Sequence, residues 1–458
     1  MRGWNILGKC CIVATVASLL FLTGCGGSQD QNNTNTNTNS NTNNNQTNSQ
    51  ALTYHKDARA IIEAKCQNCH SPGNIGPFSL SNFQEVLKFK AAIRDSVQAG
   101  RMPPWQPDDS CNEYQHNIGM SKKEKNTLIA WIDEGAVEGD ESTYKKPELR
   151  KPPEFRADVE AKLPEPYTPV KKPDDYRCFI VDWPHKEDKY ITGYKVVADN
   201  KQIAHHLIAF VVPPDLIPTF QKYDDAEKGA GYTCYGGPTG AEAGNDIRTL
   251  TRLRWIGAWA PGVDIRAFPP GVGVKIPGGS KIILQMHYNV VSNNPKPDQS
   301  KIQFQVTDKV EKEALIQPYA DPAWVVGRTM EIPAGSSDTS HSYTRELSSK
   351  RTVMLHGVGL HMHTRGRSAS VIVERANGKD KVCGLRIQKW DFNWQNSYGL
   401  KKPILIKPGD KVKLSCTWDN SAANQPMIDG KKAKPQTLNW GDGTFDEMCL
   451  GTLFLTYE

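Results

Sequence analysis

The sequence predicts a multidomain chain in which a small all-helical domain is followed by two jelly-roll-like β-sandwiches. Residues 52–145 carry apolar side chains at helical spacing, whereas the chain beyond residue 176 alternates short apolar runs with Gly, Pro and Asn. A connector rich in Pro and Lys, residues 146–176, separates the two regions. The length of 458 residues suits two or three domains. We expect the sandwiches over residues 177–310 and 311–458.

The first segment of the chain indicates export. Basic Arg2 and Lys9 precede an apolar run that ends in the sequence LTGC at residues 22–25. This arrangement resembles a bacterial lipoprotein signal, so we expect residues 1–24 to be removed and Cys25 to be lipidated. An uncleaved membrane anchor is the alternative, but the apolar run is short for a spanning helix. The body of the chain is then extracytoplasmic, on the periplasmic side or the cell surface of a bacterial membrane.

Residues 25–51 are rich in Asn and Thr and offer almost nothing to bury, which predicts a disordered tether. The formal net charge is +6, but the Lys and Arg residues are scattered rather than clustered. The charge pattern therefore predicts no nucleic-acid partner.

The helical domain contains a haem-attachment motif. Its first helical run, with Ile61 and Ile62 on one face, ends in Cys66, Cys69 and His70. This C-x-x-C-H spacing is typical of covalent haem c, in which two thiols bind the vinyl groups and the imidazole binds the iron. A redox dithiol or half of a zinc site is the alternative, which the adjacent histidine disfavours. The region resembles a class I type cytochrome c domain.

A second axial ligand is expected downstream of this motif. Met102, in the sequence "AGRMPPW", offers a soft thioether that raises the haem potential, and the following prolines favour an extended loop. His55 and His116 are the alternative ligands.

Histidines gather in the predicted strands of the second region. His205 and His206 are adjacent, His287 lies in "LQMHYNV", and His361 and His363 are separated by one residue. Alternate residues of a strand project from the same face, so His361 and His363 can bind one metal ion. Adjacent residues face opposite sides, so His205 and His206 can share an ion only where the strand is distorted. We expect such a distortion.

The identity of the metal depends on a methionine. A single histidine in a strand is more often structural than a ligand, but five with this spacing favour metal sites. Imidazole alone suits zinc, copper, iron or nickel, whereas the thioether of Met448 in "DEMCLGTLFLTY" favours copper that cycles through Cu(I). A zinc-binding sandwich is the alternative.

The order of several sequence blocks resembles the copper type II ascorbate-dependent monooxygenases. The matching blocks over residues 178–458 include "HHLIAF", "WAPGVDIRAFPPGVGVKIPGGSKIILQMHYN", "LHMHTRGRS", "DFNWQ", "IKPGDKVKLSCTWDN" and "DEMCLGTLFLTY". The resemblance implies two mononuclear copper ions, one in each sandwich, that face each other across a cleft. It also implies hydroxylation of a substrate C–H bond with O2 and two electrons.

The resemblance assigns a role to each metal-binding group. One copper site, which stores and passes an electron, consists of His205, His206 and His287. The other site, where O2 reacts, consists of His361, His363 and Met448.

The same resemblance implies a disulfide between Cys416 and Cys449, beside Met448. Cys178 and Cys234 are candidates for a second bridge, in the first sandwich. The partners of Cys111 and Cys383 are left open. His356, five residues before His361, is expected to have a structural or supporting role.

The chain departs from the peptide-amidating members of that family at three positions. Those members use an arginine, an asparagine and a tyrosine to hold a peptide carboxylate, where this chain has Gly359, Leu450 and Thr452. A peptidylglycine substrate is therefore disfavoured, and we expect a less polar wall near the second copper site.

These features predict a membrane-tethered copper monooxygenase in which a fused haem c supplies electrons in place of ascorbate. Its substrate, a small molecule or peptide, and the external donor to the haem are not identified by the sequence. The alternative is a non-catalytic electron-transfer or copper-binding lipoprotein.

Overall fold

The structure, a computed structural model, describes residues 51–458 except for 73, 75, 150–153, 235–236, 241–248, 250–251, 260–264, 291–293, 393, 429–430, 442 and 444. The expected signal, the lipidated Cys25 and most of the tether lie outside the described residues. No helix among the described residues is long and apolar enough to cross a membrane.

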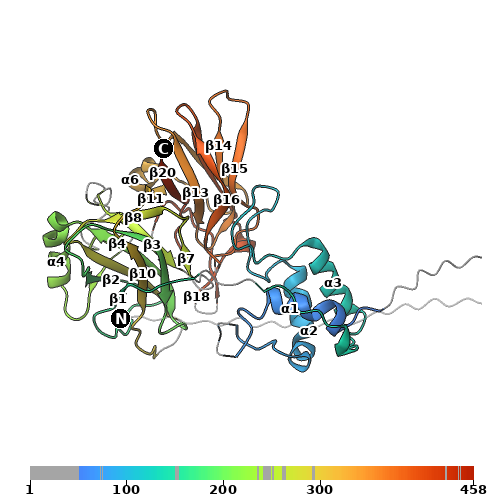
Figure 1. The fold of residues 1–458 in the computed structure, drawn as a ribbon. Coiled ribbons are helices and arrows are strands. Elements are labelled where there is room, and N and C mark those ends of the chain that lie inside the picture. The colour runs from blue at the N-terminus through green and yellow to red at the C-terminus, as the bar shows by residue number, and fades with distance from the viewer. Residues whose placement is uncertain are drawn as a thin grey trace, which may run out of the picture. The chain divides into compact units, whose positions relative to one another are not determined.

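The first described region is helical, as expected, and its helices surround one small core (Figure 1). The elements are the π-helical turn η1 (Tyr54–Ala58), α1 (Arg59–Lys65), α2 (Phe83–Gln98), α3 (Lys122–Asp133) and the 3-10 turn η2 (Glu141–Thr143). Asn82 caps α2, and Ser121 caps α3 through a reciprocal pair of hydrogen bonds with Glu124. The fully buried Ile62 and Trp131 belong to the core of this region.

The remainder of the described chain is mostly β-strand with few helices. The strands of its first half are β1 (Val159–Lys162), β2 (Asp174–Asp182), β3 (Lys189–Val197), β4 (Ala204–Val212), β5 (Tyr232–Thr233), β6 (Arg254–Trp259), β7 (Arg266–Ala267), β8 (Val272–Ile276), β9 (Lys281–Asn289) and β10 (Lys301–Thr307). The strands of its second half are β11 (Lys312–Tyr319), β12 (Thr339–Glu346), β13 (Val353–His361), β14 (Gly366–Glu374), β15 (Lys381–Ile387), β16 (Ser397–Ile406), β17 (Lys411–Trp418), β18 (Met427–Ile428), β19 (Lys431–Lys432) and β20 (Leu450–Tyr457). Short helices add η3 (Pro214–Leu216), α4 (Ile217–Asp225), α6 (Pro322–Gly327) and η5 (Ala422–Asn424).

The strands form one large sheet and one four-stranded sheet. The large sheet runs β1-β10-β3-β8-β11-β6-β4-β9-β2-β5, with β13, β16 and β20 joined to it through β11. The second sheet runs β12-β17-β14-β15. Buried side chains from both sheets, such as Leu355 of β13 and Leu414 of β17, share one core. A core between two sheets is the defining feature of a sandwich, which agrees with the expected β-sandwich class.

The expected connector contains a strand of its own. β1 lies within residues 146–176 and pairs antiparallel with β10. Val159 and Ala161 face the core while Glu160 and Lys162 face solvent, which is the period-2 pattern of a half-buried strand. Four residues are too short a run to stand out among the surrounding Pro and Lys, so composition alone favoured a connector.

Three disulfides stabilise the β region. Cys178 pairs with Cys234 and Cys416 with Cys449, so both expected bridges are present. The third bridge joins Cys111 to Cys383, across 272 residues of sequence. Disulfides of this number are typical of proteins outside the reducing cytoplasm.

The Cys111–Cys383 bridge fastens the segment after the haem-attachment region to the second sandwich. We call residues 105–115 the docking segment. Tyr114 donates a hydrogen bond to the carbonyl of Gly384 at 3.3 Å, and Gln106 donates to the carbonyls of Asp391 and Trp394 at 2.9 and 2.6 Å. The docking segment therefore holds the loop that leads into β16.

Candidate metal centres

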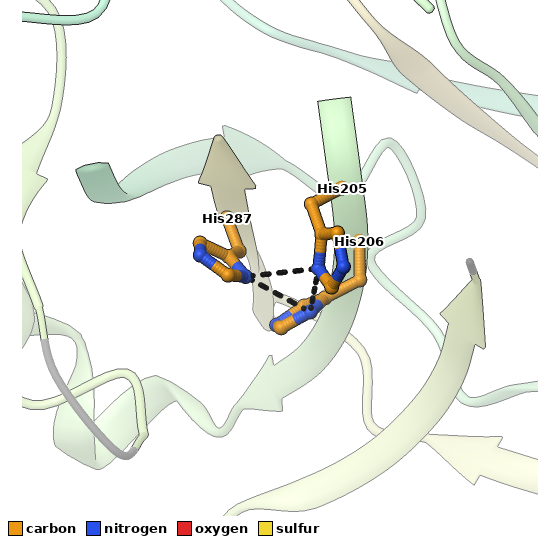
Figure 2. A group of neighbouring side chains, drawn as sticks. All are labelled: His205, His206 and His287. Atoms are coloured by element: carbon orange, nitrogen blue, oxygen red, sulfur yellow. Dashed lines mark hydrogen bonds between the residues drawn. The ribbon is translucent and has the colours of Figure 1, made fainter. Parts of the chain in front are cut away.

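Three histidine rings converge in the first half of the β region (Figure 2). The Nδ1 atom of His205 lies 3.1 Å from Nδ1 of His287 and 3.4 Å from Nδ1 of His206, and the third edge of this triangle is 3.3 Å. Imidazole nitrogens bind a first-row metal at about 2.0–2.1 Å, so two tetrahedral ligands lie about 3.3 Å apart. The three nitrogens therefore fit a single metal ion.

The distortion expected at the histidine doublet is present. β4 pairs with β9, but the register shifts between Ala204 and His206, so that His206 stands opposite His287. On a regular strand His205 and His206 would face opposite sides of the sheet. The shift lets both imidazoles reach the same point, and the dashed lines in Figure 2 join both rings to His287.

Two partners hold the ring of His287. Its Nε2 atom lies 2.8 Å from Oδ1 of Asp174, and the Tyr176 ring stacks on it at a centroid distance of 4.1 Å. A proton on Nε2 that is shared with the carboxylate leaves Nδ1 with a free lone pair, which is the form that binds a metal. Sequence reasoning missed Asp174, because it lies 113 residues before its partner.

Burial keeps these imidazoles neutral. Desolvation lowers the pKa of His205 to about 3 and lowers the pKa values of His206 and His287 as well. A neutral ring presents a lone pair to a cation, so burial prepares the three side chains for ligation.

A second pair of rings stands at the end of β13. The rings of His361 and His363 lie 5.0 Å apart at 85°, and the intervening Met362 is fully buried. His361 Nδ1 contacts the side-chain oxygen of Gln395, and His363 Nδ1 lies 3.1 Å from the carbonyl of Asp446. Both Nδ1 atoms are thus occupied as donors, and both Nε2 atoms remain for a metal.

Strand register brings Met448 to this pair. β13 and β20 run antiparallel with Gly359 opposite Thr452 and His361 opposite Leu450. The same register, continued by two residues, places Met448 at the level of His363. Met448 lines the same cavity as the two rings, which supplies a soft sulfur beside two imidazoles. Desolvation lowers the pKa of His361 to about 4, so this ring is also neutral.

Glu447, next to Met448, is a buried support of the second site that sequence reasoning missed. Its fully buried carboxylate accepts hydrogen bonds from the backbone N–H groups of His363 at 3.0 Å and Arg365 at 2.6 Å. It also accepts a bond from the indole N–H of Trp418 at 2.8 Å. Burial raises the pKa of this carboxyl to about 7. The Glu447 side chain therefore fixes the turn that contains His363, next to Met448.

Both histidine groups face one cavity of about 400 Å³. The ring of Phe392 stacks on His205 at a centroid distance of 5.3 Å and meets the edge of His363 at 6.3 Å. Phe392 belongs to the loop that Gln106 of the docking segment holds. The two sites therefore border the same cavity, and the Phe392 ring contacts one histidine of each site.

The C-x-x-C-H motif follows α1 in the helical region. Cys66 and Cys69 are partly buried and form no disulfide, and burial raises the pKa of the Cys66 thiol to about 12. His70 Nδ1 lies 3.1 Å from the carbonyl of Phe78, which leaves Nε2 for an iron. A side chain at Gly76 would meet the His70 ring at 2.8 Å, so this turn closes tightly around the imidazole. Two free thiols followed by an imidazole are the side chains that haem c attachment would use.

The helical region contains several other side chains that could serve as the second axial ligand of a haem iron. Met102 is partly buried and lies four residues after the end of α2, with its N–H bonded to the carbonyl of Ser96 at 3.2 Å. His55 Nδ1 lies 3.3 Å from the Arg59 guanidinium, and His116 has a positive φ of 59° in a turn. Met120, which sequence reasoning did not consider, packs against the helical core and offers a further thioether.

His356 has a structural environment. It is buried in β13, and its Nε2 atom lies 2.9 Å from the hydroxyl of Thr456 in β20. His356 is not one of the described residues that line the cavity.

Comparison with known proteins identifies both halves of the β region. Residues 159–295 match the family model "Copper type II ascorbate-dependent monooxygenase, N-terminal domain", and residues 323–457 match the C-terminal domain of that family. Together the two matches cover more than half of the chain.

Several curated relatives share this similarity. The chain is 25% identical to "Putative DBH-like monooxygenase protein 2" of Homo sapiens over 61% of this chain and 52% of that protein. It is 22% identical to "Dopamine beta-hydroxylase" of Homo sapiens over 67% of this chain and 47% of that protein. It is also 22% identical to "MOXD1 homolog 1" of Drosophila melanogaster, over 62% and 40% respectively. The chain spans about half the length of the curated relatives it matches.

Removal of one imidazole from the first site should lower the metal content. We expect His287→Ala to bind one copper per chain where the parent protein binds two, because two nitrogens hold the ion much less tightly than three. The matched control is His341→Ala, since His341 lies outside the cavity and contacts the carbonyl of Glu331 at 2.7 Å. Elemental analysis after dialysis measures the content; two tightly held coppers in His287→Ala would contradict the assignment.

Loss of the Glu447 carboxylate should weaken the second site. Glu447→Gln replaces an acceptor oxygen by an N–H group that faces donors, and we expect at least a tenfold loss of Cu(I) affinity at this site. We also expect a loss of about 1–3 kcal/mol in the free energy of unfolding. Chelator competition and urea denaturation measure the two quantities. Asp446→Asn, which leaves the backbone contact to His363 in place, should change neither; equal effects in both variants would refute a specific role for Glu447.

Proposed function

Because the chain belongs to the copper type II ascorbate-dependent monooxygenases, we propose that it hydroxylates a C–H bond of an organic substrate. The overall reaction is R–H + O2 + 2 electrons + 2 protons to R–OH + H2O, so one oxygen atom enters the product. The observation that carries this proposal is that two ligand sets of different character face one cavity.

The two ligand sets suit different tasks. When bound, copper supplies one-electron storage and the activation of O2. The three imidazoles of His205, His206 and His287 offer hard to borderline donors from a rigid, buried triangle. The thioether of Met448 favours the reduced ion at the site of His361 and His363, and reduction must precede the reaction with O2. We assign electron storage to the first set and the oxygen chemistry to the second.

We further infer that the helical region is a cytochrome c domain that supplies the electrons. A haem c transfers one electron at a time, which matches the one-electron steps of copper. In support, Cys66 and Cys69 form no disulfide, and His70 directly follows Cys69 with its Nδ1 atom 3.1 Å from the carbonyl of Phe78. The docking segment, which follows the candidate ligand Met102, is bridged to the sandwich that carries His361. An external donor then restores the reduced haem after each electron has left.

We propose an extracytoplasmic location with a lipid anchor at Cys25. The three disulfides agree with an oxidising compartment. The anchor itself rests on the sequence of residues 1–25, and the Asn/Thr-rich tether would separate the folded region from the membrane.

A non-catalytic copper and haem electron carrier is the second candidate function. It shares the metal sites but needs no space for a substrate. The cavity of about 400 Å³ between the two ligand sets favours the enzyme, because an electron carrier gains nothing from it.

Replacement of the sulfur ligand should separate the two functions. We expect Met448→Ile to lower reductant-dependent and substrate-dependent O2 consumption at least a hundredfold while the haem spectrum is unchanged. An oxygen electrode and mass spectrometry of products formed under ¹⁸O2 provide the measurement. Met427→Ile is the matched control, since Met427 is exposed and lies outside the cavity. Full turnover in Met448→Ile would remove the assigned role of the thioether.

The electron-supply proposal makes its own prediction. Cys66→Ala with Cys69→Ala should lose covalent haem, measured as haem absorbance that stays with the denatured protein, yet retain two coppers. In the parent protein, anaerobic stopped-flow mixing of reduced haem with Cu(II) should reoxidise the haem. Protein with His287→Ala and His361→Ala serves as the control and should show at most slow reoxidation; haem that stays reduced in the parent would exclude direct transfer.

A further inference from the structure

We propose that the substrate is an uncharged, largely apolar molecule that carries at most one or two uncharged hydrogen-bonding groups. This inference rests on the proposed function, because it takes the cavity between the two ligand sets as the place where substrate binds. It adds a chemical class that neither the family match nor the metal ligands specify.

The first argument for this class is the composition of the cavity wall. None of the described residues that line the cavity is Asp, Glu, Lys or Arg. Besides the metal-binding groups, the wall consists mainly of aromatic and aliphatic side chains, among them Phe210, Trp255, Trp259, Val325, Trp440 and Leu450. The histidines bind a metal ion as neutral imidazoles, so they add no charge of their own. A charged substrate would lose its hydration here and gain no opposite charge from these residues. Bound copper ions would repel a cation, and a carboxylate would find its only opposite charge at copper, where it would compete with O2.

The second argument for this class is the lack of space for a side chain at Gly359, in the strand that ends at His361. Gly359 lies between Ser397 of β16 and Thr452 of β20 in the pairing register. A Cβ atom at Gly359 would lie 2.3 Å from the Thr452 hydroxyl and 2.5 Å from the Ser397 hydroxyl. No side chain fits there unless both hydroxyl groups move. Where a long cationic side chain would be needed to hold a carboxylate, the cavity instead has two neutral hydroxyls, which can serve one uncharged polar group.

The third argument concerns the size of the substrate and rests on the volume of the cavity. An apolar cavity of about 150 Å³ accommodates one benzene ring, and this cavity measures about 400 Å³. The space therefore suits a molecule of roughly two rings, on the order of 12–16 non-hydrogen atoms. Aromatic side chains on the wall, such as Trp255 and Trp259, provide flat faces for such rings.

Three probes with one skeleton and different charge test the class. Biphenyl-4-ylmethanol is neutral, the corresponding methylammonium is a cation, and biphenyl-4-carboxylate is an anion at pH 7. Isothermal titration calorimetry on the full chain, copper-loaded and anaerobic, measures each dissociation constant. We expect the neutral probe to bind at least thirtyfold more tightly than either ion. Equal or tighter binding of either ion, or no binding of the neutral probe at its solubility limit, would overturn the proposal.

A charge placed in the wall tests the position. Val325 and Val326 are neighbours in α6, but only Val325 lines the cavity, and Val326 is 63% exposed. We expect Val325→Lys to weaken binding of the neutral probe at least tenfold and Val326→Lys to leave it within twofold. Equal affinities in both variants, with unchanged circular dichroism, would place the probe outside the cavity. The probe series on the parent protein decides the class even if Val325→Lys does not fold.

The outcomes distinguish this inference from the proposed function. If the neutral probe binds selectively and no reductant-dependent hydroxylation of it or of similar compounds occurs, the class of ligand stands and the monooxygenase proposal fails. If hydroxylation is found on a charged substrate, the proposed function stands and the present inference fails.

Discussion

The first metal centre depends on three ring nitrogens that lie close to one another. Lone pairs 3.1–3.4 Å apart repel unless protons or a cation lie between them. Burial disfavours protons, since it lowers the pKa values of all three histidines. The fold therefore directs three neutral imidazoles at one point, and the register shift in β4 and the Asp174 carboxylate are the features that maintain this geometry. Three nitrogens at this spacing could together bind a single metal ion.

The second site is stabilised by elements from distant parts of the sequence. Glu447 connects the turn at His363 to the indole of Trp418, and Gln395 contacts His361 from a loop that the docking segment holds. Phe392, on the same loop, contacts His205 of the other site. A displacement of this loop would thus change the contacts of a histidine in each ligand set. Gln106 of the docking segment thus contributes to the geometry of the cavity wall.

Much of this organisation was predictable from the sequence, and the reasons are local. The period of a strand brought His361 and His363 to one face, and the conflict between that period and the adjacent pair at residue 205 required the distortion that the structure contains. The C-x-x-C-H motif is likewise a local pattern, and the haem that it predicts stays a prediction. The small strand β1 was hidden by the composition around it. The bridge from Cys111 to Cys383 could not be assigned, because residues 272 positions apart are brought together only by the complete fold. Asp174, Gln395 and Glu447 were missed for the same reason.

The Cys111–Cys383 bridge has a consequence for how far the cavity wall can move. Without it, the docking segment would be joined to the second sandwich only through the 272 residues of sequence that separate the two cysteines. The disulfide replaces that long connection by one short covalent link, so Gln106 stays within reach of its two carbonyl partners when a single hydrogen bond opens. A contact that breaks here can therefore re-form at once.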